Sequence, residues 1–299
     1  MAVKYKMKKT PGDIVFTVIN YIILTAVLLA VLYPLWFILI ASFSDPNLVT
    51  LGKVLFKPAG VTLEGYKKVF EYSQVWTGFR NSVIYTVIYT FLSTYLVLTG
   101  GYFLVRKDVI GNGFITGFFM FTMFFSGGLI PTFLVVEKLG MVDSMWSVII
   151  PGAVSVYNMI IARSFFQTTI PKELREASEL DGCSNIRFFF SVVIPLSTTI
   201  IAVLALFHAV AEWNAYFDAM IYLKSSKKAP LQIVLRDILI MNEVDSSMHM
   251  DAASMDERQR ISDMLKYVLI IVSSIPMLIL YPFIQKHFVQ GVMIGSVKG

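Results

Sequence analysis

A polar run, PKELREASELDGCSNIRFFFSVVIPLS at residues 171–197, separates two strongly apolar segments of the chain. The apolar segments lie at 145–166 and 198–223. Each is long enough to cross a bilayer, because about 20 residues at the helical rise span the hydrocarbon layer. The chain is therefore expected to leave the membrane, form a compact polar structure and enter the membrane again.

The polar run is predicted to form two short helices. Residues 172–180 are good helix formers, and Asp181-Gly182 ends the first helix because glycine accepts a positive φ. A second helix would carry Arg187 and the aromatic residues 188–190. This pair is interpreted either as a docking element for another protein or as a connecting loop whose aromatic side chains lie against the membrane surface.

The composition indicates a polytopic membrane protein. The chain has 299 residues, 56% of them apolar, whereas soluble domains have about 45–50%. The net charge of +5 does not predict a nucleic-acid partner, because the basic residues cluster beside the apolar segments, where they set orientation. The single cysteine, Cys183, excludes an intrachain disulfide framework and a cysteine metal cluster.

Hydropathy predicts about six transmembrane helices with both chain ends in the cytosol, at 14–41, 79–105, 112–136, 145–166, 198–223 and 264–283. The first apolar run is too long for a cleavable signal and is expected to be retained. The predicted regions are a cytosolic tail, a first helix with an outer loop, a core transmembrane domain and a second cytosolic tail, at 1–12, 13–78, 79–284 and 285–299. The polar segment 224–263 is expected to be an outer loop.

Glycines mark two special places in the predicted helices. Gly100-Gly101 would let a neighbouring helix approach closely. Residues 126–128, Ser-Gly-Gly, followed by Pro131, either unwind the third helix or kink it. A kink that is satisfied within the bundle is the favoured interpretation.

Polar residues within apolar segments are candidate substrate contacts, because such residues are costly in a membrane. The main cluster is His208, Glu212, Trp213 and Asn214, in which His208 and Glu212 share one helix face and can pair. An aromatic ring beside amide and carboxylate groups suits a sugar. The alternative is that Trp213 simply lies at the membrane interface. A second candidate pair is Tyr157 and Asn158.

The sequence contains no catalytic constellation. The three histidines are far apart and do not form a metalloprotease motif, and there is no nucleophile elbow. A phosphate-binding loop is also absent, because Gly52-Lys53 lacks the upstream glycine. The chain is therefore predicted to be no enzyme and to bind no cofactor, and any ATP hydrolysis must come from a separate subunit.

The polar run resembles the EAA loop of ABC importer permeases. The resemblance rests on Glu176-Ala177-Ser178, Asp181-Gly182 and Ile194-Pro195-Leu196. The sequence departs from the family pattern at Ser178, where alanine is usual, and at Ile194, where leucine is usual. In that family the loop is a coupling helix that docks into a cleft of the cytosolic ATPase.

Other segments resemble the carbohydrate permeases of this family. They are Asn81-Ser82, the sequence FFSGGLIP at 124–131, Trp213-Asn214, Pro230-Leu231-Gln232 and the ending GVMIGSVKG at 291–299. The resemblance implies an all-α, maltose-permease-like ABC type I importer permease fold in a bacterial cell membrane. It implies oligosaccharide import driven by alternating access.

The resemblance also implies partners and roles. The partners are a second homologous permease, a cytosolic ATPase dimer that holds ATP and magnesium, and an extracytoplasmic sugar-binding protein. The residues implied to couple to the ATPase are Glu176, Ala177, Ser178, Asp181, Gly182, Arg187, Phe188 and Pro195, with Phe189 and Phe190 extending the docking surface.

Two other functions remain open at this point. An ion-coupled secondary transporter would need acidic residues within the membrane or broken helices in inverted repeats, and Glu212 is the single well-placed acid. A membrane-embedded enzyme or scaffold is the third, and no catalytic group supports it.

Overall fold

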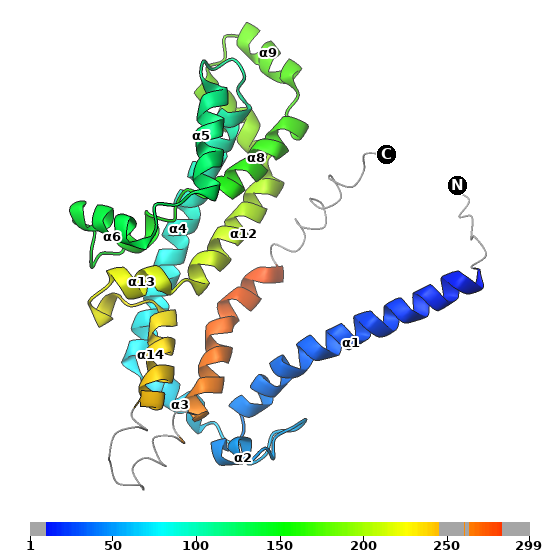
Figure 1. Ribbon diagram of the computed structural model, residues 1–299, viewed down its shortest axis with the longest axis vertical. Helices are drawn as coiled ribbons and strands as arrows, with labels where there is room; N and C mark the ends of the chain where they lie inside the picture. The colour runs from blue at the N-terminus through cyan, green and yellow to red at the C-terminus, as the bar shows by residue number, and fades with distance from the viewer. Residues whose placement is uncertain (1–9, 245–259, 261–262, 283–299) are drawn as a thin grey trace. The chain divides into compact units, whose positions relative to one another are not determined.

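The computed structural model describes residues 10–244, 260 and 263–282, and within these residues every regular element is a helix (Figure 1). The chain forms two compact units. Among the described residues, the first unit contains 10–71, 241–244, 260 and 263–272, and the second contains 72–240 and 273–282.

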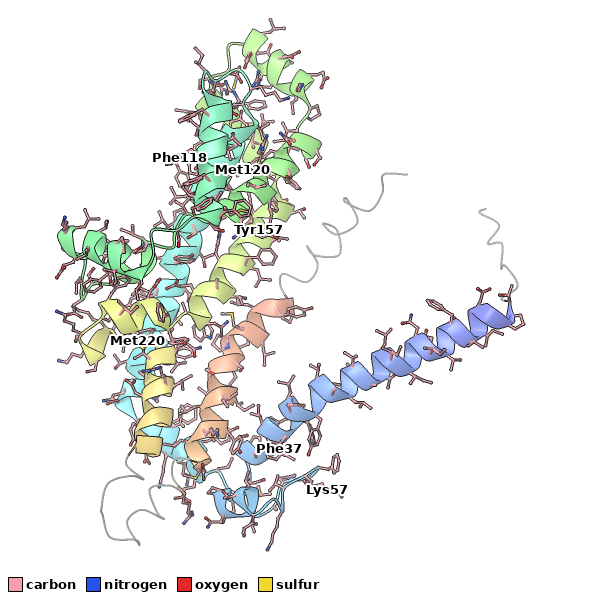
Figure 2. The ribbon with its side chains drawn as sticks, viewed as in Figure 1. Phe37, Lys57, Phe118, Met120, Tyr157 and Met220 are labelled. Atoms are coloured by element: carbon pink, nitrogen blue, oxygen red, sulfur yellow. The ribbon has the colours of Figure 1, made fainter. Side chains whose placement is uncertain are left out.

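The first unit is built on the long apolar helix α1, Pro11–Ser42, which begins with a capping box. The Thr10 backbone N–H donates to Asp13 Oδ2 at 2.8 Å, and the Asp13 N–H donates to Thr10 Oγ1 at 3.3 Å. Two short helices follow, α2 at Pro46–Thr50 and α3 at Glu64–Glu71. Phe37 lies near the end of α1 (Figure 2). Its ring meets that of Tyr267 edge-on. Most other side chains of α1 are exposed and apolar, which suits a helix that faces lipid.

The second unit is organised around α4, Ser73–Val105, against which α8, Val156–Thr169, and α12, Thr198–Asn214, pack (Figure 1). The predicted close packing at Gly100-Gly101 is confirmed. A Cβ on Gly101 would lie 2.8 Å from the Ala162 Cβ and 3.0 Å from the Met159 carbonyl oxygen. The main core surrounds this contact and includes Val97, Leu98, Leu104, Phe166, Phe188, Phe189, Val193 and Leu204.

The third predicted helix is broken, so the expectation of a kink within it was wrong. Helix α5, Asn112–Phe124, and helix α6, Leu129–Lys138, meet at an angle of 114°. The four residues between them contain Ser126-Gly127-Gly128, and serine and glycine hold a helix poorly.

The fourth and fifth predicted helices are also interrupted. The fourth forms α7, Trp146–Ile149, and α8, with Pro151 and Gly152 in the gap. Proline cannot donate the helical hydrogen bond and disfavours helical geometry in the residue before it. The fifth forms α12 and then α13, Phe217–Tyr222.

The prediction of a polar loop at 224–263 was partly wrong, because α14 occupies Leu231–Val244. Leu231, Val234 and Leu235 are buried. The spacing of these three apolar residues is that of one helix face, which packs within the second unit. The many charged residues of the segment 224–263 hid this spacing in the sequence.

Three helices are long and apolar enough to cross a membrane, namely α1, α4 and Asp263–Pro282. The count rises to five if each bent pair is one span, the pairs being α5 with α6 and Asn185–Leu196 with α12. These counts apply to the described part of the chain and rest on length and composition. The predicted terminal tails lie largely outside the described residues.

Candidate functional site

The predicted helix–turn–helix at 171–197 is present. Helix α9 occupies Lys172–Leu180, the bounds expected from the sequence, and α10 follows at Asn185–Phe188. The chain then continues as a π-helical turn, Phe189–Val193, and a short helix, Ile194–Leu196, before it bends by 83° into α12.

Gly182 ends α9 in a Schellman motif. The Cys183 N–H donates to the Ser178 carbonyl at 2.9 Å, and the Gly182 N–H donates to the Glu179 carbonyl at 3.1 Å. Gly182 has φ of +72°, and a Cβ there would meet nothing within 4 Å. The glycine is therefore needed for its backbone conformation and not for space.

Most predicted coupling residues lie at the surface of this helix pair. Exposed positions are Glu176, Ala177, Asp181, Gly182, Arg187 and Pro195. Ser178 is half-buried, and its hydroxyl donates to the Arg175 carbonyl at 2.7 Å. These positions are compatible with contact to a partner protein.

The predicted role of the aromatic residues 188–190 needs correction. Phe188 is 2% exposed and packs with Phe189 in the core, so neither side chain extends a docking surface. Phe190 is 53% exposed, as are Leu180, at 90%, and Ile186, at 73%, on either side of the turn. Phe188 and Phe189 anchor the helix pair, and the exposed apolar residues mark its outer surface.

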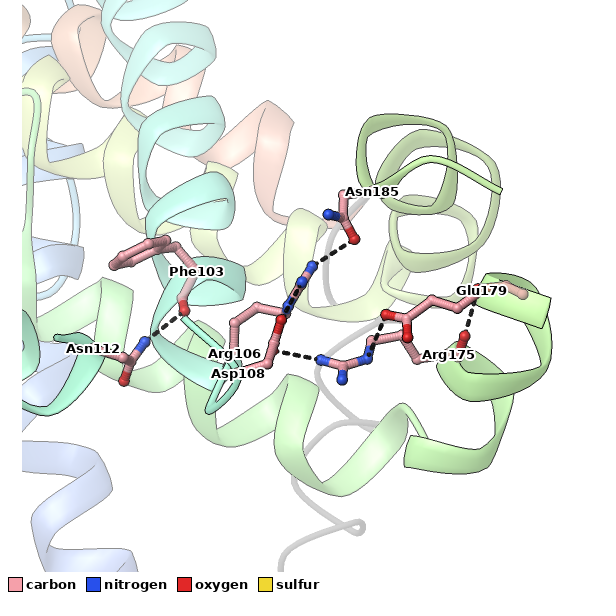
Figure 3. A network of polar contacts seen from close by, with 8 residues as sticks. Phe103, Arg106, Asp108, Asn112, Arg175, Glu179 and Asn185 are labelled. Atoms are coloured by element: carbon pink, nitrogen blue, oxygen red, sulfur yellow. Dashed lines mark hydrogen bonds and ion pairs between the residues drawn. The ribbon is translucent and has the colours of Figure 1, made fainter. Parts of the chain in front are cut away.

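A polar network centred on Asp108 fixes α9 and α10 to the end of α4 (Figure 3). Arg106 Nε and Nη2 donate to Asp108 Oδ1 and Oδ2 at 2.8 and 2.5 Å, and Arg175 Nη1 donates to Asp108 Oδ1 at 2.8 Å. Arg106 Nη1 also donates to Asn185 Oδ1 at 2.7 Å. Arg175 Nε lies 3.3 Å from Glu179 Oε1, one turn further along α9.

The electrostatics of the network favour its charged form. Hydrogen bonds from Arg106 hold the pKa of the Asp108 carboxyl well below its usual range, and Arg175 adds to the effect. The hydrogen bond to Asp108 raises the pKa of the Arg106 guanidinium. Asp108 and Arg106 therefore stay ionised together at neutral pH, and the network links α4 to both helices of the pair.

Sequence reasoning missed this network. The partners of Arg106 and Asp108 on α9 and α10 lie 67 to 79 residues further along the chain. The available signal was a carboxylate that directly follows two basic residues, together with a helix pair rich in charge.

A pocket of about 510 Å³ lies beside the network, between the ends of α4 and α8 and the helix pair. Its apolar and aromatic lining residues, which we call the floor, are Tyr102, Val105, Phe166, Ile170 and Phe188. Its charged lining residues, which we call the rim, are Arg106, Lys107, Asp108, Lys172, Arg175 and Glu176.

The polar residues predicted to contact sugar divide into two groups. His208 is buried between α4, α8 and α12. Its Nδ1 lies 3.2 Å from Thr94 Oγ1, and its Nε2 lies 3.0 Å from Asn158 Nδ2. Because both ring nitrogens are occupied, the predicted pairing with Glu212 is not formed. His208 and Asn158 thus join three helices.

The remaining candidates do not form one site. Trp213 is buried and its Nε1 donates to the Ser273 carbonyl at 3.0 Å, so its ring is not an open platform for sugar. Asn214 donates to the Val210 carbonyl of its own helix at 2.8 Å. Glu212 is half-buried, and Tyr157, at the start of α8, is exposed (Figure 2).

Asn81-Ser82 has a structural role at the other end of α4. Asn81 Nδ2 donates to the carbonyls of Lys227 and Ala229 at 2.8 and 3.0 Å, and Ser82 Oγ accepts from the Leu231 N–H at 2.8 Å. One turn further along, the Tyr85 hydroxyl donates to the Lys228 carbonyl at 2.8 Å. These contacts hold the segment 224–231, which we call the clamped segment.

Asp143 holds the same segment from the α6–α7 connection. Its Oδ1 accepts from the N–H groups of Lys224 and Ser225, both at 3.0 Å, and its Oδ2 lies 2.8 Å from Lys228 Nζ. Hydrogen bonding from Lys228, and then from the two backbone amides, lowers the pKa of the Asp143 carboxyl to about 2.

No family model matches the chain, but whole-length relatives do. The polygalacturonan/rhamnogalacturonan transport system permease protein YtcP of Bacillus subtilis (strain 168) is 40% identical over 285 residues, which cover 95% of this chain and 98% of that protein. Protein LplC of the same organism is 36% identical over 299 residues, all of both chains.

A solved structure has the same fold. The crystal structure of a bacterial ABC transporter involved in the import of the acidic polysaccharide alginate matches 94% of this chain and 99% of its own chain. The TM-score is 0.84 and the sequence identity is 30%.

Proposed function

Since the chain belongs to the permease subunits of ABC transporters that import sugars, we propose that it forms one half of a membrane pathway for oligosaccharides. The other half is a second, homologous permease. An extracytoplasmic sugar-binding protein delivers the oligosaccharide, and a cytosolic ATPase dimer holds ATP and magnesium. In this proposal the chain crosses the bacterial cell membrane several times and does not itself hydrolyse ATP.

The observation that carries the proposal is the helix pair α9–α10, with its exposed outer surface and its fixed base. Leu180 and Ile186 present apolar side chains beside the exposed Glu176 and Arg187. A small apolar pair with a charged border suits insertion into a cleft of another protein.

The base of the helix pair gives it the rigidity that coupling requires. The Asp108 network joins α9 and α10 to the end of α4. Phe188 and Phe189 fix the following turn in the core beside α4, α8 and α12. A displacement of α9 by the ATPase would therefore move the helices of the pathway, because a packed interior transmits movement instead of absorbing it.

The first test is sugar-stimulated ATP hydrolysis by the assembled complex in lipid, with oligogalacturonides and maltodextrins as substrates. Glu176→Lys reverses a charge on the exposed surface. Gly182→Pro removes the φ of +72° that ends α9, because proline is fixed near −65°. We expect both variants to lose stimulation while the membrane part still assembles.

The matched control is Glu137→Lys, which makes the same charge change at an exposed position of α6. It is expected to retain stimulation. Full stimulation in both coupling variants would refute the role of α9–α10. Uptake that follows an ion gradient and persists without the ATPase would instead support a secondary transporter.

A further inference from the structure

We infer that the pocket beside the Asp108 network binds the phosphate group of an anionic phospholipid. The inference goes beyond the transport function, because it concerns a ligand of the permease that is not transported. It rests on the position of the pocket, on its uncompensated positive charge and on its apolar floor.

The pocket lies where a membrane helix ends. Helix α4 is long and apolar enough to cross a membrane, and its last residue, Val105, lines the pocket. Ile170, directly after α8, lines it as well. A pocket at the end of a membrane helix lies at the depth of lipid headgroups, and the basic residues here place it on the cytosolic side.

The rim has positive charge that the protein does not neutralise. Asp108 pairs with both Arg106 and Arg175, and Glu179 is a second carboxylate beside Arg175, so the charges of these two arginines are balanced within the protein. Within the described part of the chain, Lys107 and Lys172 form no ion pair, and both side chains are exposed.

Glu176 is the other carboxylate of the rim, and its single negative charge reduces the positive charge of Lys107 and Lys172 without cancelling it. Two free ammonium groups beside an ion-pair network are a receptor for a phosphate anion.

The floor explains why a lipid fits better than a soluble anion. Tyr102, Val105, Phe166, Ile170 and Phe188 supply apolar and aromatic surface below the charged rim. Basic pockets between membrane helices on the cytosolic side bind anionic headgroups, and the glycerol and upper acyl carbons need such a surface. A soluble phosphate would leave this floor unused. A bound lipid would brace α9 against α4 and α8.

The test measures lipid retention, so it is independent of transport. The full complex, purified in mild detergent, is exposed to equal amounts of phosphatidylglycerol and phosphatidylcholine, and the bound lipid is measured by mass spectrometry. The pocket variant is Lys107→Gln with Lys172→Gln. The control is Lys224→Gln with Lys227→Gln, which removes the same charge from two exposed lysines of the clamped segment.

We expect the wild type to retain phosphatidylglycerol in preference to phosphatidylcholine, and the pocket variant to bind it roughly tenfold more weakly. The control variant should match the wild type in lipid binding. Without added lipid, both variants should keep the wild-type melting temperature because the lysines are exposed and unpaired. Equal losses in pocket and control variants would overturn the proposal, as would no preference between the lipids. Binding of inorganic phosphate as tight as that of phosphatidylglycerol would assign the pocket to a soluble anion and overturn the lipid assignment.

Discussion

Replacing Asp108 by asparagine should loosen α9 and α10 from the end of α4. Asp108 accepts three hydrogen bonds from two guanidinium groups, at 2.8, 2.5 and 2.8 Å. Asparagine has a similar size but carries no charge and offers one acceptor oxygen. The variant would leave Arg106 without its counter-charge and would leave Arg175 paired with Glu179 alone.

The size of the effect follows from the exposure of these side chains. A hydrogen bond to a charged group contributes about 1.5–3 kcal/mol when sheltered, whereas an exposed ion pair contributes about 0.2–1 kcal/mol. Arg106 is 12% exposed and Asp108 is 40% exposed, so the network lies between these limits. We therefore expect a loss of about 2 kcal/mol in the local stability of α9 and α10.

Amide hydrogen exchange of the full complex in lipid would measure this loss. Because 1.4 kcal/mol is a factor of ten, exchange at residues 172–188 should become about 30-fold faster. Sugar stimulation of ATP hydrolysis should fall, because a loosened α9 no longer transmits displacement to α4. The control is Asp237→Asn, which removes an exposed carboxylate 3.8 Å from Arg236 and should leave this exchange unchanged. Unchanged exchange at α9 in Asp108→Asn would refute the bracing role of the network.

Three further changes have expected outcomes. Gly101→Ala should lower the free energy of unfolding by about 1–3 kcal/mol, because its Cβ would overlap Ala162. The control is Gly113→Ala, where a Cβ meets nothing, and it should be neutral when both variants are compared by thermal unfolding. Gly182→Ala should cost about 1–2 kcal/mol through its φ of +72° alone, and a cost near zero would contradict the capping role. The Asp143 carboxyl has a pKa lowered from 3.8 to about 2, so its contribution to holding the clamped segment is complete above pH 4 and is lost as the pH falls toward 2. Amide hydrogen exchange at residues 224–231 should therefore become faster over that interval. In Asp143→Asn the exchange should not change over the same interval.

The sequence was sufficient for features that local chemistry determines. The bounds of α9 and the turn at Gly182 followed from helix propensity and from the conformational range of glycine. The close approach at Gly100-Gly101 followed from the same reasoning about small residues. The apolar segments indicated a membrane protein, and its class followed from the resemblance of the polar run to the EAA loop of ABC importer permeases.

Features that depend on distant residues were not predictable in this way. Asp108 accepts from Arg175 of α9, and Arg106 donates to Asn185 of α10, so both contacts join residues far apart in the sequence. The aromatic residues beginning at Phe188 looked like a docking surface because sequence gives no sign that α4 and α8 bury two of them. Pro151 was overlooked as a helix break because the apolar segment around it continues on both sides.

The clamped segment is held mainly through its main chain, which has an evolutionary consequence. Asn81, Ser82 and Tyr85 bind carbonyl and N–H groups that every non-proline residue possesses, and Asp143 adds two more N–H contacts. The path of the segment is therefore largely independent of its own side chains. Lys224, Ser226 and Lys227 are exposed and can change by mutation while the backbone keeps its course. Natural selection, or a protein engineer, can use these positions to alter what the surface recognises without redesigning the transporter beneath it.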